Sequence, residues 1–260
     1  MNTTRRTLLA GSAIAAAASF GVRTGLRAQE STPQAAGAST PAASQAPGYA
    51  IARLRTVPSP ELNQAVFPDV MRHFLPPTAD IPGFEGYIFA FDDADPATSI
   101  TVTLLAGESA RSAAEAIAAD YVGQMDPRFD VETSLAEEGP VRIFALAPTP
   151  AAQLPPFLHG TTLRLRNQTN APDFDLESGI AIAIDTLIPT FLAQPGFILY
   201  CWFERDGGRL VTEIWEAPEA MDAGQAALTA WRDEHFDSPT ASETTEAVGT
   251  IGYAELRALR

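Results

Sequence analysis

The pattern that decides the fold occurs twice, as PGFEGYIFAFDDADPATSITVTLLAGESA at Pro82–Ala110 and as PGFILYCWFERDGGRLVTEIWEAPEA at Pro195–Ala220. Each copy begins with Pro-Gly-Phe and has a tyrosine three residues after the phenylalanine, at Tyr87 and Tyr200. An apolar or alternating strand then leads through a polar turn into a second strand and an alanine-rich helix. A repeat of this length predicts two halves with the same arrangement.

The flanking residues extend the match. RLRT at Arg53–Thr56 aligns with RLRN at Arg164–Asn167, and the order of elements in each half is strand, helix, strand, strand, helix, strand. We expect the first helices at Pro60–Leu75 and Glu177–Ala193. The stretch IAIAI inside the second of these alternates like a strand, but the repeat favours a helix there. The closing strands are expected near residues 141–146 and 250–256.

This order is that of the ferredoxin-like split βαβ motif. One four-stranded sheet with helices on a single face leaves its other face uncovered, and a second sheet can cover it. We therefore predict an α+β fold in which two ferredoxin-like βαββαβ halves, residues 49–147 and 158–260, pack sheet to sheet as an intrachain α/β-barrel pseudo-dimer. Because the second half supplies the packing partner, we expect a monomer.

The motif PGF…Y…F leading to IWEAPEAMDA at Ile214–Ala223 resembles the antibiotic-biosynthesis-monooxygenase (ABM)-like domains of the dimeric α/β-barrel superfamily. The resemblance covers Leu163–Phe236 well and Ile51–Met125 more loosely, since Leu105 stands where the second half has Trp215. It implies a superfamily that includes cofactor-free oxygenases, haem-degrading enzymes, dye-decolourising peroxidases, isomerases and proteins without a known activity. Fold follows from such a resemblance more directly than function.

The N-terminal residues have the pattern of an export signal. Arg5 and Arg6 precede an apolar stretch, Thr7–Val22, and small residues lead to Ala28. This resembles a twin-arginine signal peptide, residues 1–28, followed by a disordered Ala/Ser/Pro-rich linker, residues 29–48. The apolar run is shorter than a helix that spans a bilayer. We expect an exported protein (periplasm, cell envelope or extracellular) that is not bound to a membrane after signal removal.

Charge and cysteine content narrow the classes of partner. The formal net charge is −15, and all 17 basic residues are arginine. Nucleic acids and anionic membranes need a cationic surface, so neither is expected as a partner. Cys201 is the only cysteine, which excludes an intrachain disulfide.

The candidate site rests on differences between the aligned halves. Where the first half has Thr56, Phe89, Leu105 and Met125, the second has polar or aromatic residues at Asn167, Trp202, Trp215 and His235. We predict a pocket in the second half that takes a small apolar or aromatic molecule. Its expected ligand-binding residues are Tyr200, Trp202, Trp215 and Trp231.

Asn167 and His235 are the candidate catalytic residues. Asn167 shares a strand face with leucines and could donate to a ligand, or it could cap the loop at the strand end. His235 could act as acid, base or haem ligand, or it could be a helix-terminal histidine favoured by the helix dipole. We predict no metal site and no cofactor. Haem remains the alternative, although the tryptophan that the haem-degrading branch has on the last helix would fall near Gly224.

The same-face pairs Arg53/Arg55 and Arg164/Arg166 could bind a carboxylate of a ligand or neutralise acidic neighbours. Three hypotheses for function stay open. The first is an ABM-type oxygenase, cofactor-free or haem-assisted, that acts on a small aromatic or polyketide-like substrate. The second is a non-catalytic exported ligand-binding protein, and the third is a structural module of the cell envelope.

Overall fold

The computed structural model describes residues 46–148 and 153–259, which belong to one compact unit, Ala43–Arg260. The expected signal peptide (residues 1–28) and most of the expected linker lie outside the described residues. Within the described part, no helix combines the length and apolar character needed to cross a membrane.

The elements of the first half follow the predicted order. They are β1 (Tyr49–Thr56), α1 (Pro60–Asp69), the π-helical turn η1 (Val70–Phe74), α2 (Leu75–Ala79), β2 (Phe84–Asp92), β3 (Thr98–Leu105), α3 (Glu108–Gln124), the 3-10 turn η2 (Pro127–Phe129) and β4 (Glu132–Leu146).

The second half repeats this order after the short turn η4 (Pro156–Leu158). Its elements are β5 (Thr162–Asn170), α4 (Leu176–Ile182), the π-helical turn η5 (Ala183–Leu187), α5 (Ile188–Leu192), β6 (Phe197–Arg205), β7 (Gly208–Trp215), α6 (Pro218–His235), β8 (Ala241–Leu256) and the 3-10 turn η6 (Arg257–Leu259).

The first helix of each half begins at a side-chain cap. Ser59 Oγ accepts from the Leu62 amide, and Asp175 Oδ1 accepts from the Ser178 amide, so each cap satisfies a backbone donor of the first turn. The stretch Ile180–Ile184 is helical, as the repeat predicted and its alternation did not. Its alternating apolar residues fit the helix because Ile180 and Ala183, three residues apart, both face the core.

The closing strands are much longer than expected. β4 and β8 begin at Glu132 and Ala241, so the predicted segments form only their final parts. The early parts are polar and largely exposed, and their sequence therefore lacks the apolar signal of a buried strand.

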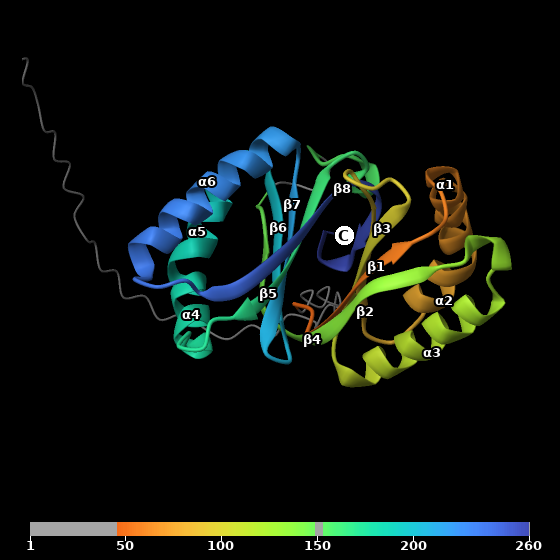
Figure 1. Cartoon of the computed structure of the whole chain (residues 1–260), viewed down its shortest axis with the longest axis horizontal. Coiled ribbons are helices and arrows are strands. Elements are labelled where there is room, and N and C mark those ends of the chain that lie inside the picture. The colour runs from red at the N-terminus through yellow and green to blue at the C-terminus, as the bar shows by residue number, and fades with distance from the viewer. Residues whose placement is uncertain (1–45, 149–152, 260) are drawn as a thin grey trace, which may run out of the picture. The chain divides into compact units, whose positions relative to one another are not determined.

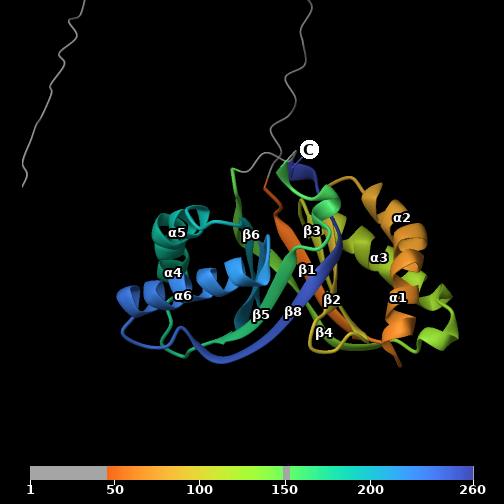
Figure 2. The same cartoon turned by 90° about the horizontal axis from the view of Figure 1, so that it is seen from above.

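These long strands join the two halves into a closed barrel with the strand order β1-β3-β2-β8-β5-β7-β6-β4. The first part of β4 pairs with β1 and its last part with β6, while β8 pairs first with β5 and then with β2. Each half therefore completes its own sheet and then extends into the other, as the paths of β4 and β8 in Figure 1 and Figure 2 show. The predicted sheet-to-sheet α+β architecture is confirmed in this closed form.

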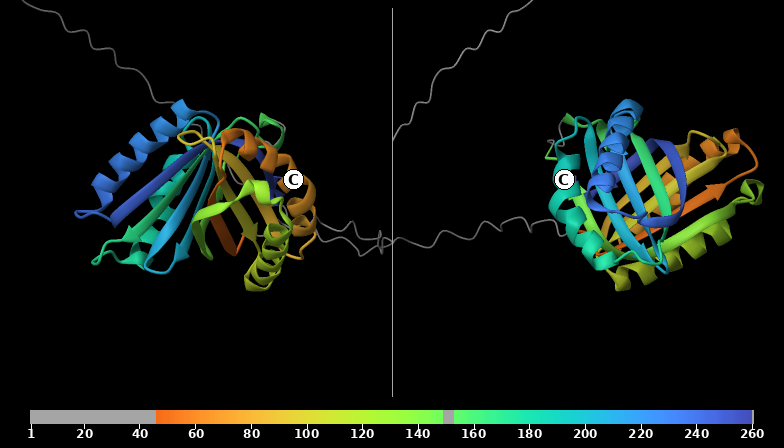
Figure 3. Two further views of the ribbon diagram at one scale, coloured as in Figure 1. Left: turned by 45° about the vertical axis from the view of Figure 1, so that its right-hand side comes forward. Right: turned by 60° about the vertical axis from the view of Figure 1, so that its left-hand side comes forward.

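The buried side chains of the described residues form three cores. One fills the barrel interior, and Cys201 lies within it. The second lies between β1–β3 and α1–α3, and the third lies between β5–β7 and α4–α6. Figure 1 and Figure 3 show these two groups of helices on opposite sides of the strands. Any space between sheet and helices therefore belongs to one half only.

The strand register corrects one predicted alignment. Tyr87 pairs with Thr103 and Tyr200 pairs with Glu213, so Thr103 and Glu213 are equivalent. Their neighbours on the first strands are Ile51 and Arg164, respectively. The predicted alignment of RLRT with RLRN was therefore wrong by two residues. It followed the similarity of the two sequences, whereas the hydrogen-bonding register places RLRN two residues earlier along the strand than RLRT. By strand position, Arg166 corresponds to Arg53, Gln168 to Arg55, and Asn167 to Leu54 rather than Thr56.

Candidate functional site

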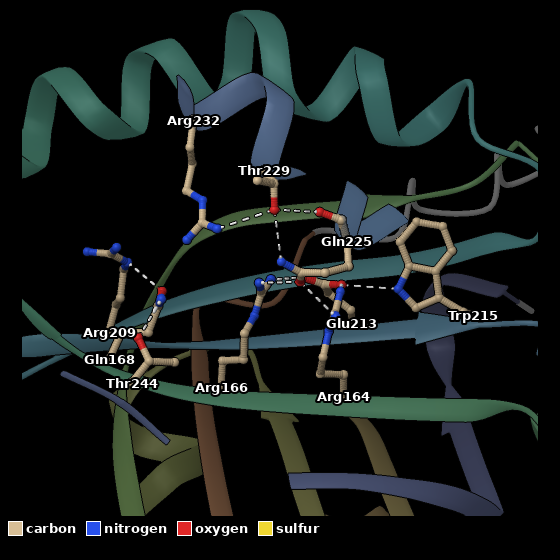
Figure 4. Close-up of polar contacts among 10 residues, drawn as sticks. All are labelled: Arg164, Arg166, Gln168, Arg209, Glu213, Trp215, Gln225, Thr229, Arg232 and Thr244. Carbon is tan, nitrogen blue, oxygen red and sulfur yellow. Dashed lines mark hydrogen bonds and ion pairs between the residues drawn. The ribbon is translucent and has the colours of Figure 1, made fainter. Parts of the chain in front are cut away.

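A cluster of charged side chains is buried between β5, β7 and α6 in the second half. Arg164 and Arg166 alternate with barrel-facing leucines on β5, so both guanidinium groups face the helices. Arg164 Nη2 lies 2.6 Å from Glu213 Oε2, and Arg166 Nη2 donates to Glu213 Oε1. Trp215 Nε1 donates to the same carboxylate at 3.1 Å (Figure 4). Glu213, which is fully buried, therefore holds three donors in place.

Helix α6 completes this cluster with an amide. Gln225 Oε1 accepts from Arg164 Nη1 at 2.8 Å and from Arg166 Nη1 at 3.4 Å. Its Nε2 atom donates to Thr229 Oγ1 on the next turn at 3.3 Å (Figure 4). The amide thus connects the sheet to the helix without adding negative charge.

The cluster has more positive charge than negative. Two guanidinium groups share the one carboxylate of Glu213, and the Nε atoms of Arg164 and Arg166 are buried without a hydrogen-bond partner. Burial lowers the pKa of Arg166 to about 10, with the charge of Arg164 contributing in the same direction. A buried donor without a partner costs about 1–3 kcal/mol, so an acceptor near these atoms would be stabilised.

A third buried cation, Arg209 on β7, lies beside the cluster. All of its hydrogen-bond partners among the described residues are neutral: Gln168 Oε1 at 3.0 Å, Asn170 Oδ1, and the carbonyl and hydroxyl oxygens of Thr240. Its guanidinium carbon lies 4.9 Å and 5.2 Å from the ring centres of Phe174 and Trp202. Burial lowers the pKa of Arg209 to about 10. Neutral acceptors and ring faces hold this side chain in place but leave its charge uncompensated.

A cavity of about 40 Å³ opens at this point, between the sheet and α4, η5 and α6. The described residues that line it include no carboxylate. Trp202 Nε1 is a further buried donor without a partner. The polar and aromatic residues of the wall are Arg166, Gln168, Arg209, Arg232, Thr240, Phe174, Tyr200, Trp202, Trp231 and Phe236.

The predicted ligand-binding residues separate into two groups. Tyr200, Trp202 and Trp231 line the cavity, and Trp231 is held by a 2.7 Å hydrogen bond from its Nε1 to Thr186 Oγ1. Trp215 does not line it. Its ring packs so closely against α6 that a Cβ on Gly224 would lie 2.2 Å from Trp215 Cη2. The structure therefore places Trp215 in the packing beneath the charged cluster.

The predicted catalytic pair is not brought together. His235 Nδ1 lies 2.8 Å from the carbonyl oxygen of Trp231, and the imidazole stacks on the Trp231 ring, outside the cavity lining. Asn167 alternates with Arg166 and Gln168 and so faces the other side of the sheet, where its Oδ1 accepts from Arg205 Nε at 2.7 Å. The two residues lie on opposite faces of one sheet.

Neither haem nor a metal ion fits what the cavity offers. Its volume of about 40 Å³ is far below the roughly 300–1,000 Å³ of typical ligand and cofactor sites. The position at Gly224, where the haem-degrading branch has its helix tryptophan, is covered by the ring of Trp215. No cluster of three or more metal-ligating side chains occurs among residues 46–148 and 153–259.

Sequence reasoning missed Glu213, Arg209 and Gln225. The signal for the first two was present in RLVTEIW, where Arg209 and Glu213 alternate with barrel-facing residues and so share the helix-facing side with Trp215. The predicted role of the arginine pair in neutralising an acid is confirmed for Arg164 and Arg166, which share Glu213.

Comparison with solved structures identifies the fold. A protein of Fusobacterium nucleatum assigned as a monooxygenase aligns with a TM-score of 0.61 and 11% identity, over 81% of this chain and 95% of that chain. A protein of Lactobacillus acidophilus, also assigned as a monooxygenase, aligns with a TM-score of 0.59 and 11% identity, over 82% and 97% of the two chains.

Two further structures have the same arrangement. An anthrone oxidase-like protein aligns with a TM-score of 0.52 and 12% identity, over 83% of this chain and 95% of that chain. A chlorite dismutase variant of Candidatus Nitrospira defluvii aligns with a TM-score of 0.52 and 12% identity, over 80% and 92%. No protein-family model and no curated protein sequence matches this chain. At these identities the likeness establishes a shared fold and no more.

Proposed function

We propose that this chain is an exported small-molecule-binding protein whose ligand has an anionic head group and an aromatic or apolar body. One observation carries the proposal. At the cavity in the second half, two buried donors without a partner, Arg166 Nε and Trp202 Nε1, lie in a wall that also contains the uncompensated guanidinium of Arg209. An oxyanion would supply the missing acceptors and balance the charge.

The size of the cavity indicates which part of the ligand it can hold. About 40 Å³ accommodates a carboxylate or a similar head group rather than a whole aromatic acid. Phe174 and Phe236 lie at the wall with ring centres 5.9 Å apart, edge to face, and offer an apolar surface for the body of the ligand.

The intrinsic tryptophans provide the test. All three tryptophans of the chain, at positions 202, 215 and 231, lie in the second half. We expect benzoate to change the tryptophan emission saturably and benzamide, which has the same shape without the charge, to bind at least about tenfold more weakly. Arg209→Gln should remove this preference, while Arg55→Gln in the first half should leave it intact. Equal affinity for benzoate and benzamide in the wild-type protein would reject an anionic ligand.

The fold likeness favours a second candidate, an ABM-type oxygenase with an aromatic substrate, because three of the aligned structures are an anthrone oxidase-like protein and two proteins assigned as monooxygenases. Oxidation of an anthrone methylene to a ketone consumes one O₂ and releases one water. Oxygen uptake with an anthrone, measured for the wild type, His235→Ala and Asn167→Ala, tests this candidate. If the wild-type protein takes up oxygen no faster than a protein-free solution, the result argues against an oxygenase. If all three proteins take up oxygen equally fast, His235 and Asn167 are not catalytic residues.

We further propose that the two halves are a tandem duplication and that the mature chain is a monomer. The barrel closes within one chain, which supports this state. Light scattering should give the mass of a single chain, and N-terminal sequencing of the exported protein should begin after Ala28. A non-catalytic structural module of the cell envelope is the remaining alternative, and failure of every ligand titration would favour it.

A further inference from the structure

The first half contains a counterpart of the cavity described above. About 20 Å³ is enclosed between β1–β3 and the helices α1–α3. Tyr87 and Phe89 on β2 form part of its wall, in the positions that Tyr200 and Trp202 occupy on β6. Arg55 and Ser99 also line it. The two halves therefore place a small, aromatic-walled space at the same point of the fold.

Each of these spaces has one arginine at the same rung of the ladder. In the first half Arg55 of β1 pairs with Ser99 of β3. In the second half the equivalent pair is Gln168 of β5 and Arg209 of β7. The guanidinium group therefore comes from β1 in the first half, but from β7, the counterpart of β3, in the second half. A positive charge is present at this position in both halves, although the residue that carries it differs.

The surroundings of Arg55 differ from those of Arg209 in one respect. Arg209 donates four hydrogen bonds to neutral acceptors, whereas the Arg55 side chain has no hydrogen bond or ion pair with any described residue. The nearby acids are already engaged: Glu115 binds Arg53, and Asp69 accepts from the Tyr121 hydroxyl at 2.9 Å. Burial, followed by repulsion from Arg53, lowers the pKa of Arg55.

We propose that the first-half cavity is a binding site for a compact monovalent anion, a halide or a carboxylate as small as formate, held by the guanidinium of Arg55. The volume accommodates about one or two water-sized groups, which fits such an ion and excludes an aromatic acid. Arg55 is half-buried and no described side chain pairs with it, so an anion in contact with the guanidinium would gain a charge-assisted hydrogen bond. This proposal rests on Arg55 and does not depend on the function proposed for the second half.

The test uses the full-length protein and the ³⁵Cl NMR line width of chloride, which increases when chloride exchanges on and off a protein site. We expect Arg55→Gln to lower the protein-dependent broadening by roughly twofold, since the second-half cavity remains. Arg55→Lys keeps the charge and should retain most of the broadening. Arg72→Gln is the matched control, because Arg72 is an exposed arginine of the same half.

Competition by formate and the behaviour of the variants decide whether Arg55 holds the anion. Formate added to the wild-type protein should narrow the chloride line by competition, and the same addition to Arg55→Gln should have a smaller effect. If Arg55→Gln folds and broadens chloride as much as the wild type, or if Arg72→Gln lowers the broadening equally, the proposal is overturned. Loss of broadening in both Arg55→Gln and Arg55→Lys also contradicts it, because a charge-based site would survive in the lysine variant.

Discussion

Replacing Glu213 by glutamine tests the energetics of the buried charge cluster. The substitution keeps the size of the side chain but removes the carboxylate that forms ion pairs with both Arg164 and Arg166, which are almost completely buried. Removing one partner of a buried ion pair costs about 3–5 kcal/mol, because the remaining charge is left uncompensated. The glutamine oxygen can still accept from one guanidinium or from Trp215 Nε1, so we expect a loss near the lower end of this range.

The assay is urea unfolding followed by circular dichroism, with the thermal midpoint as a second measure. For a domain of roughly 200 residues, 1 kcal/mol corresponds to about 2–4 °C, so a loss of about 3 kcal/mol lowers Tm by roughly 6–12 °C. Glu115→Gln is the matched control in the first half. Glu115 pairs with Arg53 but is 40% exposed, and a pair of that kind contributes about 1 kcal/mol or less.

A loss below about 1 kcal/mol for Glu213→Gln, or an equal loss for the two glutamate variants, would refute the reasoning. A third variant separates charge from packing. Replacing Glu213, Arg164 and Arg166 together by leucine and two methionines removes every charge of the cluster and approximately preserves its volume. If uncompensated charge is the cause, this triple variant should be more stable than Glu213→Gln.

Two other predictions follow from burial. Gly224→Ala should destabilise the protein by about 1–3 kcal/mol, because the added Cβ would lie 2.2 Å from the ring of Trp215. Gly123→Ala in α3 is the control, since a Cβ there would have no neighbouring atom within 4 Å. It should be neutral or stabilising by up to about 1 kcal/mol. Burial raises the pKa of Tyr200 to about 12, so the folded state keeps a proton that the unfolded state releases above pH 10, and stability falls as pH rises from about 10 to 12. At about pH 11 this contributes about 1 kcal/mol, so Tyr200→Phe should lose less stability than the wild type between about pH 9 and 11, measured by urea unfolding; identical pH profiles would contradict the assignment.

Much of the architecture was predictable because it is local. The sequence after each Pro-Gly-Phe predicts an apolar strand, a polar turn and an alanine-rich helix. The repeat also predicted the helix at Ile180–Ile184 correctly, although the alternation of that stretch favours a strand. The early parts of β4 and β8 were missed, since their exposed polar residues, such as those after Glu132, give no apolar period. Barrel closure through these strands depends on pairing between halves, which local sequence does not encode.

The site was only partly predictable. Comparison of the halves pointed to Tyr200, Trp202 and Trp231, which line one cavity. It did not find Arg209, because a one-to-one alignment sets Arg209 against Ser99 and hides the arginine on the neighbouring strand. The shifted register of the first strands also gave Asn167 a polar counterpart that it does not have. Both failures concern cross-strand pairing, which becomes visible only when the ladder is formed.

A crystal structure of the protein with bound benzoate is the most direct test of the central claim that the second half recognises an anion. The account predicts the carboxylate within hydrogen-bond distance of Trp202 Nε1 and Arg166 Nε, beside Arg209, with the ring toward Phe174 and Phe236. Benzoate bound only elsewhere, or bound in this cavity with its carboxylate directed away from the arginines, would contradict it.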